Sequence, residues 1–245
     1  MTLLIGIKTN TGLDRVVLAS DRQLSEYEEG AFSSKRPIRK IYSGDFWAMG
    51  DAGGDDQDVR RFYRMLRGHK GYGSGPEQAK RMIKVAIKER RFHEVRELNT
   101  ELMRTGENID IEDTHAFLLA VNSPRIGLWL VDEFGNIKDP PKERDFDYLL
   151  LGNGKKEAEG YIQRLLAEEQ IDRDRISTRT ALSVVRGALK AAEKKADVGF
   201  GYDVVVVSKK GVEDLGREIG KSVASAERAA WRNVENKYNG PDESE

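Results

Sequence analysis

Segments typical of strands and segments typical of helices follow one another in blocks along this chain, and this order restricts the fold more than any other feature. Short apolar runs come first, two helical patterns follow, and strands and helices then recur in the same order before a last strand and helix. Strictly alternating strands and helices build parallel sheets, whereas blocks of consecutive strands build antiparallel sheets that helices cover. The order therefore predicts an α+β fold. Because no Pro- or Ser-rich linker divides the chain, we expect a single domain over residues 1–245.

The first block begins almost at the N-terminus. The apolar run of residues 3–7 is too short for a helix and predicts a buried strand, and residues 15–20 follow as the second strand of a hairpin. A loop is expected over residues 24–37, which are polar and contain Gly, Ser and Pro. The other expected strands are 38–42, 46–49, 114–121, 125–132, 148–151 and 202–207, the expected helices are 56–68, 76–104, 155–169, 178–195 and 218–238, and a C-terminal helical extension and acidic tail is expected from residue 216 onward.

The composition excludes several classes of protein. The chain has 41 basic and 42 acidic side chains and a formal net charge of -1, whereas a dedicated nucleic-acid-binding protein should carry a basic excess. Cysteine is absent, which excludes disulfides, a thiol nucleophile and thiolate metal ligands. The three histidines are isolated and lack metal-ligand spacing, so we expect neither a metal site nor another cofactor.

The N-terminal sequence and the hydropathy of the chain favour a cytoplasmic protein. Residues 1–8 contain no basic leader and no apolar stretch long enough for a signal peptide. No apolar run approaches the roughly 20 residues that a membrane span needs. We therefore expect a cytoplasmic protein that does not associate with a membrane.

Thr2 is the candidate nucleophile. If the initiator Met1 is removed, Thr2 carries a side-chain hydroxyl and a free α-amine on the same residue. The hydroxyl can attack a carbonyl while the amine accepts its proton, directly or through one water, so such a residue combines a nucleophile with a base. The α-amine suits this role because its pKa in model peptides is about 7.7 to 8.0. A small residue after Met is common, however, and Thr2 alone does not establish this chemistry.

Three further features could act together with Thr2. Asp21 ends the second expected strand, which lies beside the start of the first, so its carboxylate can approach Thr2. Lys40, if buried near an amine and a hydroxyl, would raise the local positive potential and favour the deprotonated form of each. Backbone N–H groups around Gly53, at the entrance of an expected helix, can stabilise an oxyanion. Each feature also has a structural interpretation: a charge at a strand end, one solvated base among the four basic residues of 35–40, and a helix-entry turn.

Several motifs together resemble a known family. They are Thr2 with Gly6 in the first strand, Leu18-Ala19-Ser20-Asp21-Arg22, Lys40-Ile41-Tyr42, Met49-Gly50-Asp51-Ala52-Gly53, Gly152-Asn153-Gly154 and Tyr202-Asp203-Val204-Val205-Val206-Val207. In combination they are similar to motifs of proteasome β-type subunits, which belong to the N-terminal-nucleophile hydrolase superfamily. The match covers roughly residues 2–215, and its first three motifs are the most specific. The chain therefore resembles a divergent bacterial or archaeal proteasome homologue.

The resemblance implies a fold and a set of catalytic roles. The fold is a four-layer αββα sandwich, in which two antiparallel sheets lie between two helical layers. Thr2 matches the nucleophile, Lys40 matches the catalytic lysine, and Asp21 matches the acid that orients this lysine. Gly53 matches the residue whose backbone N–H stabilises the oxyanion. The implied activity is that of a threonine endopeptidase.

The chain departs from the family at two catalytic positions. Asn153 stands where a Ser usually lies between the two glycines; its amide can hydrogen-bond the α-amine but cannot relay a proton as a hydroxyl does. Asp197 matches, after a shift, the acid in the loop before the last long strand, and the Ser that accompanies this acid in the family is absent near Val198. These departures suggest a divergent branch of the family.

The resemblance also implies a substrate-binding site. Ser25 matches a position where the substrate backbone pairs as an added strand. The residues that match the pocket for the side chain before the scissile bond are Leu24, Ile38, Tyr42, Asp51 and Asp55. Two carboxylates in this pocket would favour a Lys or Arg side chain, although either could instead cap the following helix or pair with Lys40.

Three functions remain open from the sequence. The first is a threonine peptidase that hydrolyses peptides or unfolded proteins inside a homo-oligomeric ring, with or without an ATP-dependent unfoldase that feeds the chamber. The second is another acyl-transfer reaction on the same Thr2, such as peptide ligation or hydrolysis of a non-peptide amide. The third is a catalytically silent structural or binding subunit, which would follow if Met1 stays in place and blocks the amine of Thr2.

Overall fold

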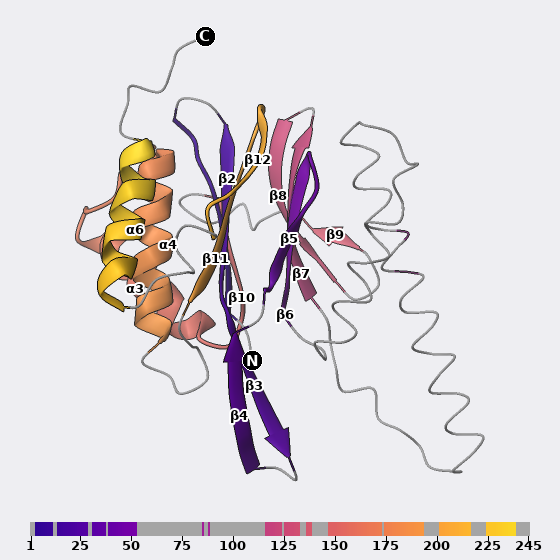
Figure 1. Ribbon diagram of the computed structural model, residues 1–245. Coiled ribbons are helices and arrows are strands. Elements are labelled where there is room, and N and C mark those ends of the chain that lie inside the picture. The colour runs from indigo at the N-terminus through magenta and orange to yellow at the C-terminus, as the bar shows by residue number, and fades with distance from the viewer. Residues whose placement is uncertain are drawn as a thin grey trace.

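Two antiparallel sheets pack face to face in this protein, and helices cover the outer face of the first (Figure 1). In the computed structural model, the described residues are 3–11, 14–28, 31–37, 39–52, 85, 88, 116–123, 125–132, 136–138, 147–172, 174–193, 201–216 and 224–238. This arrangement confirms the prediction of an α+β sandwich with two antiparallel sheets.

The first sheet has the strand order β10-β1-β2-β11-β12, and every neighbouring pair in it is antiparallel. Its strands are β1 (Leu3–Lys8), β2 (Arg15–Asp21), β10 (Tyr148–Gly152), β11 (Tyr202–Ser208) and β12 (Gly211–Asp214). The helices on its outer face are α3 (Lys155–Ala167), α4 (Thr178–Ala192) and α6 (Ala224–Lys237) (Figure 1). The first sheet therefore lies between a helical layer and the second sheet.

The second sheet has the strand order β5-β6-β7-β8-β9. Its strands are β5 (Ile41–Ser43), β6 (Trp47–Ala52), β7 (Ala116–Ser123), β8 (Arg125–Val131) and β9 (Ile137–Lys138). The two helices expected over 56–68 and 76–104 lie outside the described residues, apart from residues 85 and 88, which are helical.

The apolar runs are continuous because both faces of the first sheet are buried. In β1, the side chains of Leu3, Ile5 and Ile7 join the core beneath the helices, whereas Leu4 joins the core between the two sheets. Antiparallel strands with one solvated face alternate between apolar and polar residues. A strand that is covered on both faces has no solvent-facing positions, which is why residues 3–7 form an unbroken apolar run.

Glycines let the two sheets approach closely. A Cβ atom at Gly6 would lie 2.7 Å from a methyl carbon of Leu128 in β8, and one at Gly50 would lie 2.6 Å from a methyl carbon of Leu4. Real Cβ atoms do not approach carbons this closely, so a side chain at either position would displace the leucine methyl group that fills the space. The glycines of the motifs around Thr2 and Asp51 thus serve the packing of the sandwich.

The prediction of a loop over residues 24–37 is wrong. These residues form the hairpin of β3 (Gln23–Glu28) and β4 (Ala31–Pro37), a separate two-stranded sheet that projects from one end of the sandwich (Figure 1). Because the hairpin belongs to neither large sheet, its sequence does not need the apolar alternation from which strands are predicted. Its Pro37 lies at the last position of β4, where a missing N–H is tolerated.

The helices of the outer layer agree with the sequence pattern. The N-cap Ser177 accepts a hydrogen bond from the Thr180 N–H at 3.1 Å and begins α4 close to the expected position. Trp231 of α6 is fully buried and meets the ring of Tyr202 edge-on, with the centroids 5.9 Å apart. Strands β9 and β12 were not expected, since they are too short to show a period. No helix among the described residues is long and apolar enough to cross a membrane.

Candidate active site at the start of the first strand

The β3–β4 hairpin brings Asp21 and Lys40 together. β2 ends at Asp21, and Lys40 directly precedes β5, so the two residues flank the open end of the hairpin, where Gln23 pairs with Pro37. The Lys40 Nζ donates a hydrogen bond to Asp21 Oδ2 at 2.9 Å. The hairpin is also the link between the two sheets, so the pair lies where the chain crosses from one to the other.

The second oxygen of Asp21 binds the start of the chain. The Leu3 N–H donates to Asp21 Oδ1 at 2.8 Å. This N–H belongs to the peptide bond that joins Thr2 to Leu3, so the carboxylate holds both Lys40 and the amide next to Thr2. Asp21 is fully buried and Lys40 is 3% exposed. Buried charges are retained when they are paired and hydrogen-bonded in this way.

Burial lowers the pKa of the Lys40 ammonium below its ordinary value. Desolvation is the largest cause, and it outweighs the charge and hydrogen bond of Asp21 and the charge of Asp203, which act in the opposite direction. A lysine with a lowered pKa releases its proton at lower pH than a free lysine, and such shifts are frequent at catalytic sites. Lys40 therefore has the electrostatic properties of a group that assists proton transfer.

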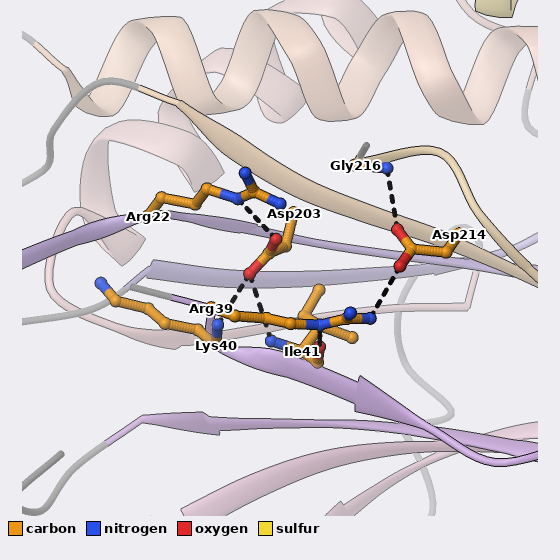
Figure 2. A network of polar contacts seen from close by, with 7 residues as sticks. All are labelled: Arg22, Arg39, Lys40, Ile41, Asp203, Asp214 and Gly216. Atoms are coloured by element: carbon orange, nitrogen blue, oxygen red, sulfur yellow. Dashed lines mark hydrogen bonds and ion pairs between the residues drawn. The ribbon is translucent and has the colours of Figure 1, made fainter. Parts of the chain in front are cut away.

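A second carboxylate, Asp203 of β11, binds the side chain that follows Asp21 and the backbone at Lys40 (Figure 2). Its Oδ1 accepts a hydrogen bond from Arg22 Nε at 2.6 Å. Its Oδ2 accepts from the Lys40 backbone N–H at 2.7 Å and from the Ile41 N–H at 3.4 Å. Asp203 thereby connects the residue that follows Asp21 with the residue that supplies the ammonium group.

Next to this contact lies a similar one from β12. The Arg39 Nη2 donates to Asp214 Oδ2 at 2.8 Å, and the other Asp214 oxygen accepts from the Gly216 N–H at 3.0 Å (Figure 2). Arg39 Nε also donates to the Ile41 carbonyl at 2.6 Å. Asp214 thus holds the Arg39 side chain, whereas Asp203 holds the backbone of Lys40 and Ile41.

The turn around Asn153 lies beside the first residue of β1. Gly152 ends β10 and pairs with Leu3, so Asn153 follows at the same end of the sheet. Gly152 has φ 91° and Gly154 has φ 79°, which is the left-handed region that favours glycine. Asn153 is exposed and does not enter the core. The fold therefore presents an amide side chain at the edge where the chain begins.

Two expected pocket residues lie in the strands that follow Lys40. The Asp51 N–H donates to the Lys40 carbonyl at 3.4 Å, and the Asp51 side chain is buried. Tyr42 pairs with Met49 on the face opposite Gly50, and the Arg39 guanidinium lies 5.9 Å from the centre of the Tyr42 ring. Asp51 of β6 therefore lies beside the backbone of Lys40, which directly precedes β5.

The remaining expected site residues are not all described. Thr2, Ile38, Gly53, Asp55 and Asp197 lie outside the described residues. Leu24 and Ser25 lie in β3, and only their backbone is described. Among the described residues, no group of three or more His, Asp and Glu side chains could hold a metal ion.

Asp203 and Arg22 were not among the residues expected at the site from the sequence, although both occur in the motifs that resemble the family. Asp203 is a lone charged residue in the otherwise apolar strand of residues 202–207. A carboxylate in such a strand must find hydrogen-bond donors, because its burial without them is costly. This rule could have marked Asp203 for attention, but only the structure identifies its partners.

Among the comparisons with known proteins, the one with solved structures finds a similar fold. No protein-family model matches the chain, and no curated protein matches it. A similar solved structure is a Gly-1 mutant of Anbu from Hyphomicrobium sp. strain MC1, with 12% sequence identity, a TM-score of 0.64 and coverage of 100% of both chains. The likeness extends over the whole of both chains, and at this identity it shows a shared fold alone.

Proposed function

We propose that this protein is a proteasome-like threonine peptidase that uses Thr2 as its N-terminal nucleophile. Removal of Met1 frees the α-amine of Thr2, and the Thr2 hydroxyl then attacks the carbonyl of a peptide bond. The sandwich fold, which the chain shares with Anbu over its whole length, supports this proposal.

One observation supports the proposal above all others. A single buried carboxylate, Asp21, binds both the Lys40 ammonium and the amide that joins Thr2 to Leu3. A buried carboxylate needs donors for both of its oxygens, and here the two donors are an ammonium group and the peptide N–H next to the proposed nucleophile. In a nucleophile-and-base site this arrangement keeps the lysine beside the residue that reacts.

The reaction follows from these groups. As the Thr2 oxygen bonds to the substrate carbonyl carbon, its proton moves to the α-amine, and the Lys40 charge lowers the energy of the developing negative charge. The tetrahedral intermediate collapses when the C–N bond breaks and the leaving amine takes the proton. A water then attacks the resulting ester, which releases a carboxylic acid and restores the Thr2 hydroxyl.

The substrates we propose are peptides and unfolded proteins. Gly53 would supply an oxyanion N–H, and Ser25 of β3 would pair with the substrate backbone. Asp51, next to Lys40 in the second sheet, would favour a basic side chain before the scissile bond. We further propose that copies of the chain form a closed ring, which native mass spectrometry would test directly.

Asn153 favours a second candidate, acyl transfer to an acceptor other than water. Asn153 is exposed at the end of β10 beside Leu3, and its amide cannot relay a proton to or from water as a hydroxyl would. If the ester on Thr2 hydrolyses slowly, an amine of a second peptide can attack it and form a new peptide bond. Product masses in the presence of an added peptide amine distinguish ligation from hydrolysis.

The test of the proposed function compares the wild-type protein with Thr2→Ala and Thr2→Ser. Intact mass should show loss of one Met from the wild type. Cleavage of an unfolded protein should disappear in Thr2→Ala and persist at a reduced rate in Thr2→Ser, which keeps a hydroxyl. Retention of Met1, or equal cleavage by Thr2→Ala, would contradict the proposal.

A further inference from the structure

Asp203 connects the two segments that supply the ion pair of the candidate active site. It accepts hydrogen bonds from the Arg22 side chain, immediately after Asp21, and from the backbone N–H of Lys40 itself (Figure 2). The backbone N–H of Arg22 in turn donates to Gly201 at 2.9 Å, just before β11. The start of β11 thus fixes both ends of the path from Asp21 to Lys40.

The segment that contains Lys40 needs such a contact. Lys40 lies just outside β5, so the strand ladder does not fix its backbone through the N–H group. The N–H groups of Lys40 and Ile41 both donate to one oxygen of Asp203. Buried N–H groups require acceptors, and without this oxygen the segment would have to move to find others.

We propose that Asp203 is a positioning residue of this site: by binding Arg22 and the Lys40 backbone at once, it keeps the Lys40 ammonium against Asp21 and the Thr2–Leu3 amide. The proposal rests on the proposed function, in which Lys40 assists the reaction of Thr2. The contacts of Asp203 among the described residues are to Arg22, Lys40 and Ile41, so it acts through the placement of Lys40.

Asp203 acts on the charge of Lys40 as well as on its place. Asp21 from β2 and Asp203 from β11 are carboxylates that raise the pKa of Lys40. Asp51 from β6 contacts Lys40 through its backbone N–H, which donates to the Lys40 carbonyl. Arg22 is the cation that faces Asp203. The negative charge of Asp203 raises the pKa of Lys40 and opposes the larger effect of burial. Loss of this charge therefore lowers that pKa further.

The variant that tests the proposal is Asp203→Asn. An amide has one oxygen and one NH₂ group in place of two carboxylate oxygens. In either orientation its NH₂ group faces a donor, either Arg22 Nε or the Lys40 N–H, so one contact is lost with little change in volume. The matched control is Asp214→Asn, because Asp214 also binds an arginine and a backbone N–H but does not bind Lys40.

The first measurement is the pKa of Lys40, which is obtained from an NMR titration of protein with ¹³C-labelled lysine. The Lys40 signal is assigned by its loss in Lys40→Arg. The second is the pH profile of labelling by a peptide epoxyketone, which reacts with the hydroxyl and the free amine of an N-terminal threonine. In Asp203→Asn we expect the Lys40 pKa to move to lower pH, and with it the basic limb of the profile, on which Lys40 loses the charge that assists Thr2. We also expect the plateau rate to fall by at least about tenfold, because misplaced groups react slowly. Asp214→Asn should keep the wild-type profile.

A folded Asp203→Asn protein with the wild-type Lys40 titration and labelling profile would overturn the proposal. If that variant does not fold, Arg22→Gln keeps it testable, because it leaves Asp203 bonded to Lys40 but without its compensating cation. The Lys40 pKa should then rise, and an unchanged pKa in Arg22→Gln would also overturn the proposal. Failure of the wild type to react with the epoxyketone would contradict the function proposed for Thr2, whereas the NMR titration would still decide the role of Asp203.

Discussion

The two ends of the first sheet use similar charged groups in different surroundings. At one end, Lys40 and Asp21 form an ion pair whose side chains are 4% and 0% exposed. At the other end, Lys237 and Tyr238 at the end of α6 bind Glu213 of β12, and the Lys237 and Glu213 side chains are 50% and 40% exposed. Burial therefore distinguishes the two pairs more than their chemistry does.

This difference in burial decides which form of each group, neutral or charged, is favoured. Burial lowers the pKa of Lys40, because desolvation outweighs its partners. At Glu213 burial raises the pKa, but the hydrogen bonds from Lys237 and Tyr238 outweigh it and the net pKa is lowered. The exposed carboxylate is thus more firmly charged, whereas the buried lysine is closer to losing its proton. Only the buried end has the electrostatic properties of a catalytic site.

The largest effect that we predict is on activity at the buried end. Replacement of Lys40 by Met should lower the rate of labelling or cleavage by about 10³-fold, since a group that assists proton transfer contributes roughly 10² to 10⁴. Lys210→Met, at the exposed end of the same sheet, is the matched control and should keep the wild-type rate. Equal losses in the two variants would remove the distinction between the ends.

The second prediction concerns the free energy of unfolding. Lys40→Met leaves Asp21 buried without its cation and should cost about 3 to 5 kcal/mol, whereas Lys237→Met breaks an exposed pair and should cost less than about 1 kcal/mol. In Asp21→Asn combined with Lys40→Met, the amide oxygen can still accept from the Leu3 N–H and no buried charge remains, so much of the stability should return while activity stays lost. Urea denaturation of the three variants measures this, and a double variant that is no more stable than Lys40→Met would contradict it.

A smaller effect is expected on substrate preference. Asp51→Ala should lower cleavage after Lys or Arg by about tenfold relative to cleavage after Leu, the scale on which single pocket contacts discriminate substrates. Matched fluorogenic peptides that differ only at this residue measure the ratio. An unchanged ratio would show that Asp51 serves the sheet beside Lys40 and takes no part in recognition.

The smallest effect belongs to Glu213 and its dependence on pH. A carboxyl whose folded-state pKa is lowered stabilises the fold above its ordinary pKa of about 4.3, and this stabilisation is lost as the pH falls through the lowered value. Glu213→Gln should therefore match the wild type in strong acid and be slightly less stable near neutral pH. Amide hydrogen exchange in α6 reports this locally. A difference between the two proteins that grows on acidification would contradict the assignment.

The periodic parts of the fold could be predicted from the sequence, and the hairpin that projects from the sandwich could not. Buried strands such as residues 3–7 and 202–207 are apolar on both faces, and α4 has a capping Ser177, so their positions were predicted closely. The β3–β4 hairpin has no buried face that its sequence must match, and it was predicted as a loop. That hairpin is the element that brings Lys40 to Asp21.

The candidate site was accessible from the sequence only through resemblance. Asp21 and Lys40 are 19 residues apart, and one of several bases near residue 40 could not be selected by spacing alone. The contact between Asp21 and the Leu3 N–H depends on a backbone group, which no sequence pattern marks. Asp203 was visible as a charge in an apolar strand, but its partners come from two other segments of the chain.

The most direct test of this account is the adduct that a peptide epoxyketone forms with the wild-type protein, mapped by mass spectrometry of the N-terminal peptide. We predict one adduct per chain on Thr2, after loss of Met1, with no adduct in Thr2→Ala and a greatly slowed reaction in Lys40→Met. A chain that keeps Met1 and forms no adduct at residue 2, or one that reacts equally well without Lys40, would contradict it.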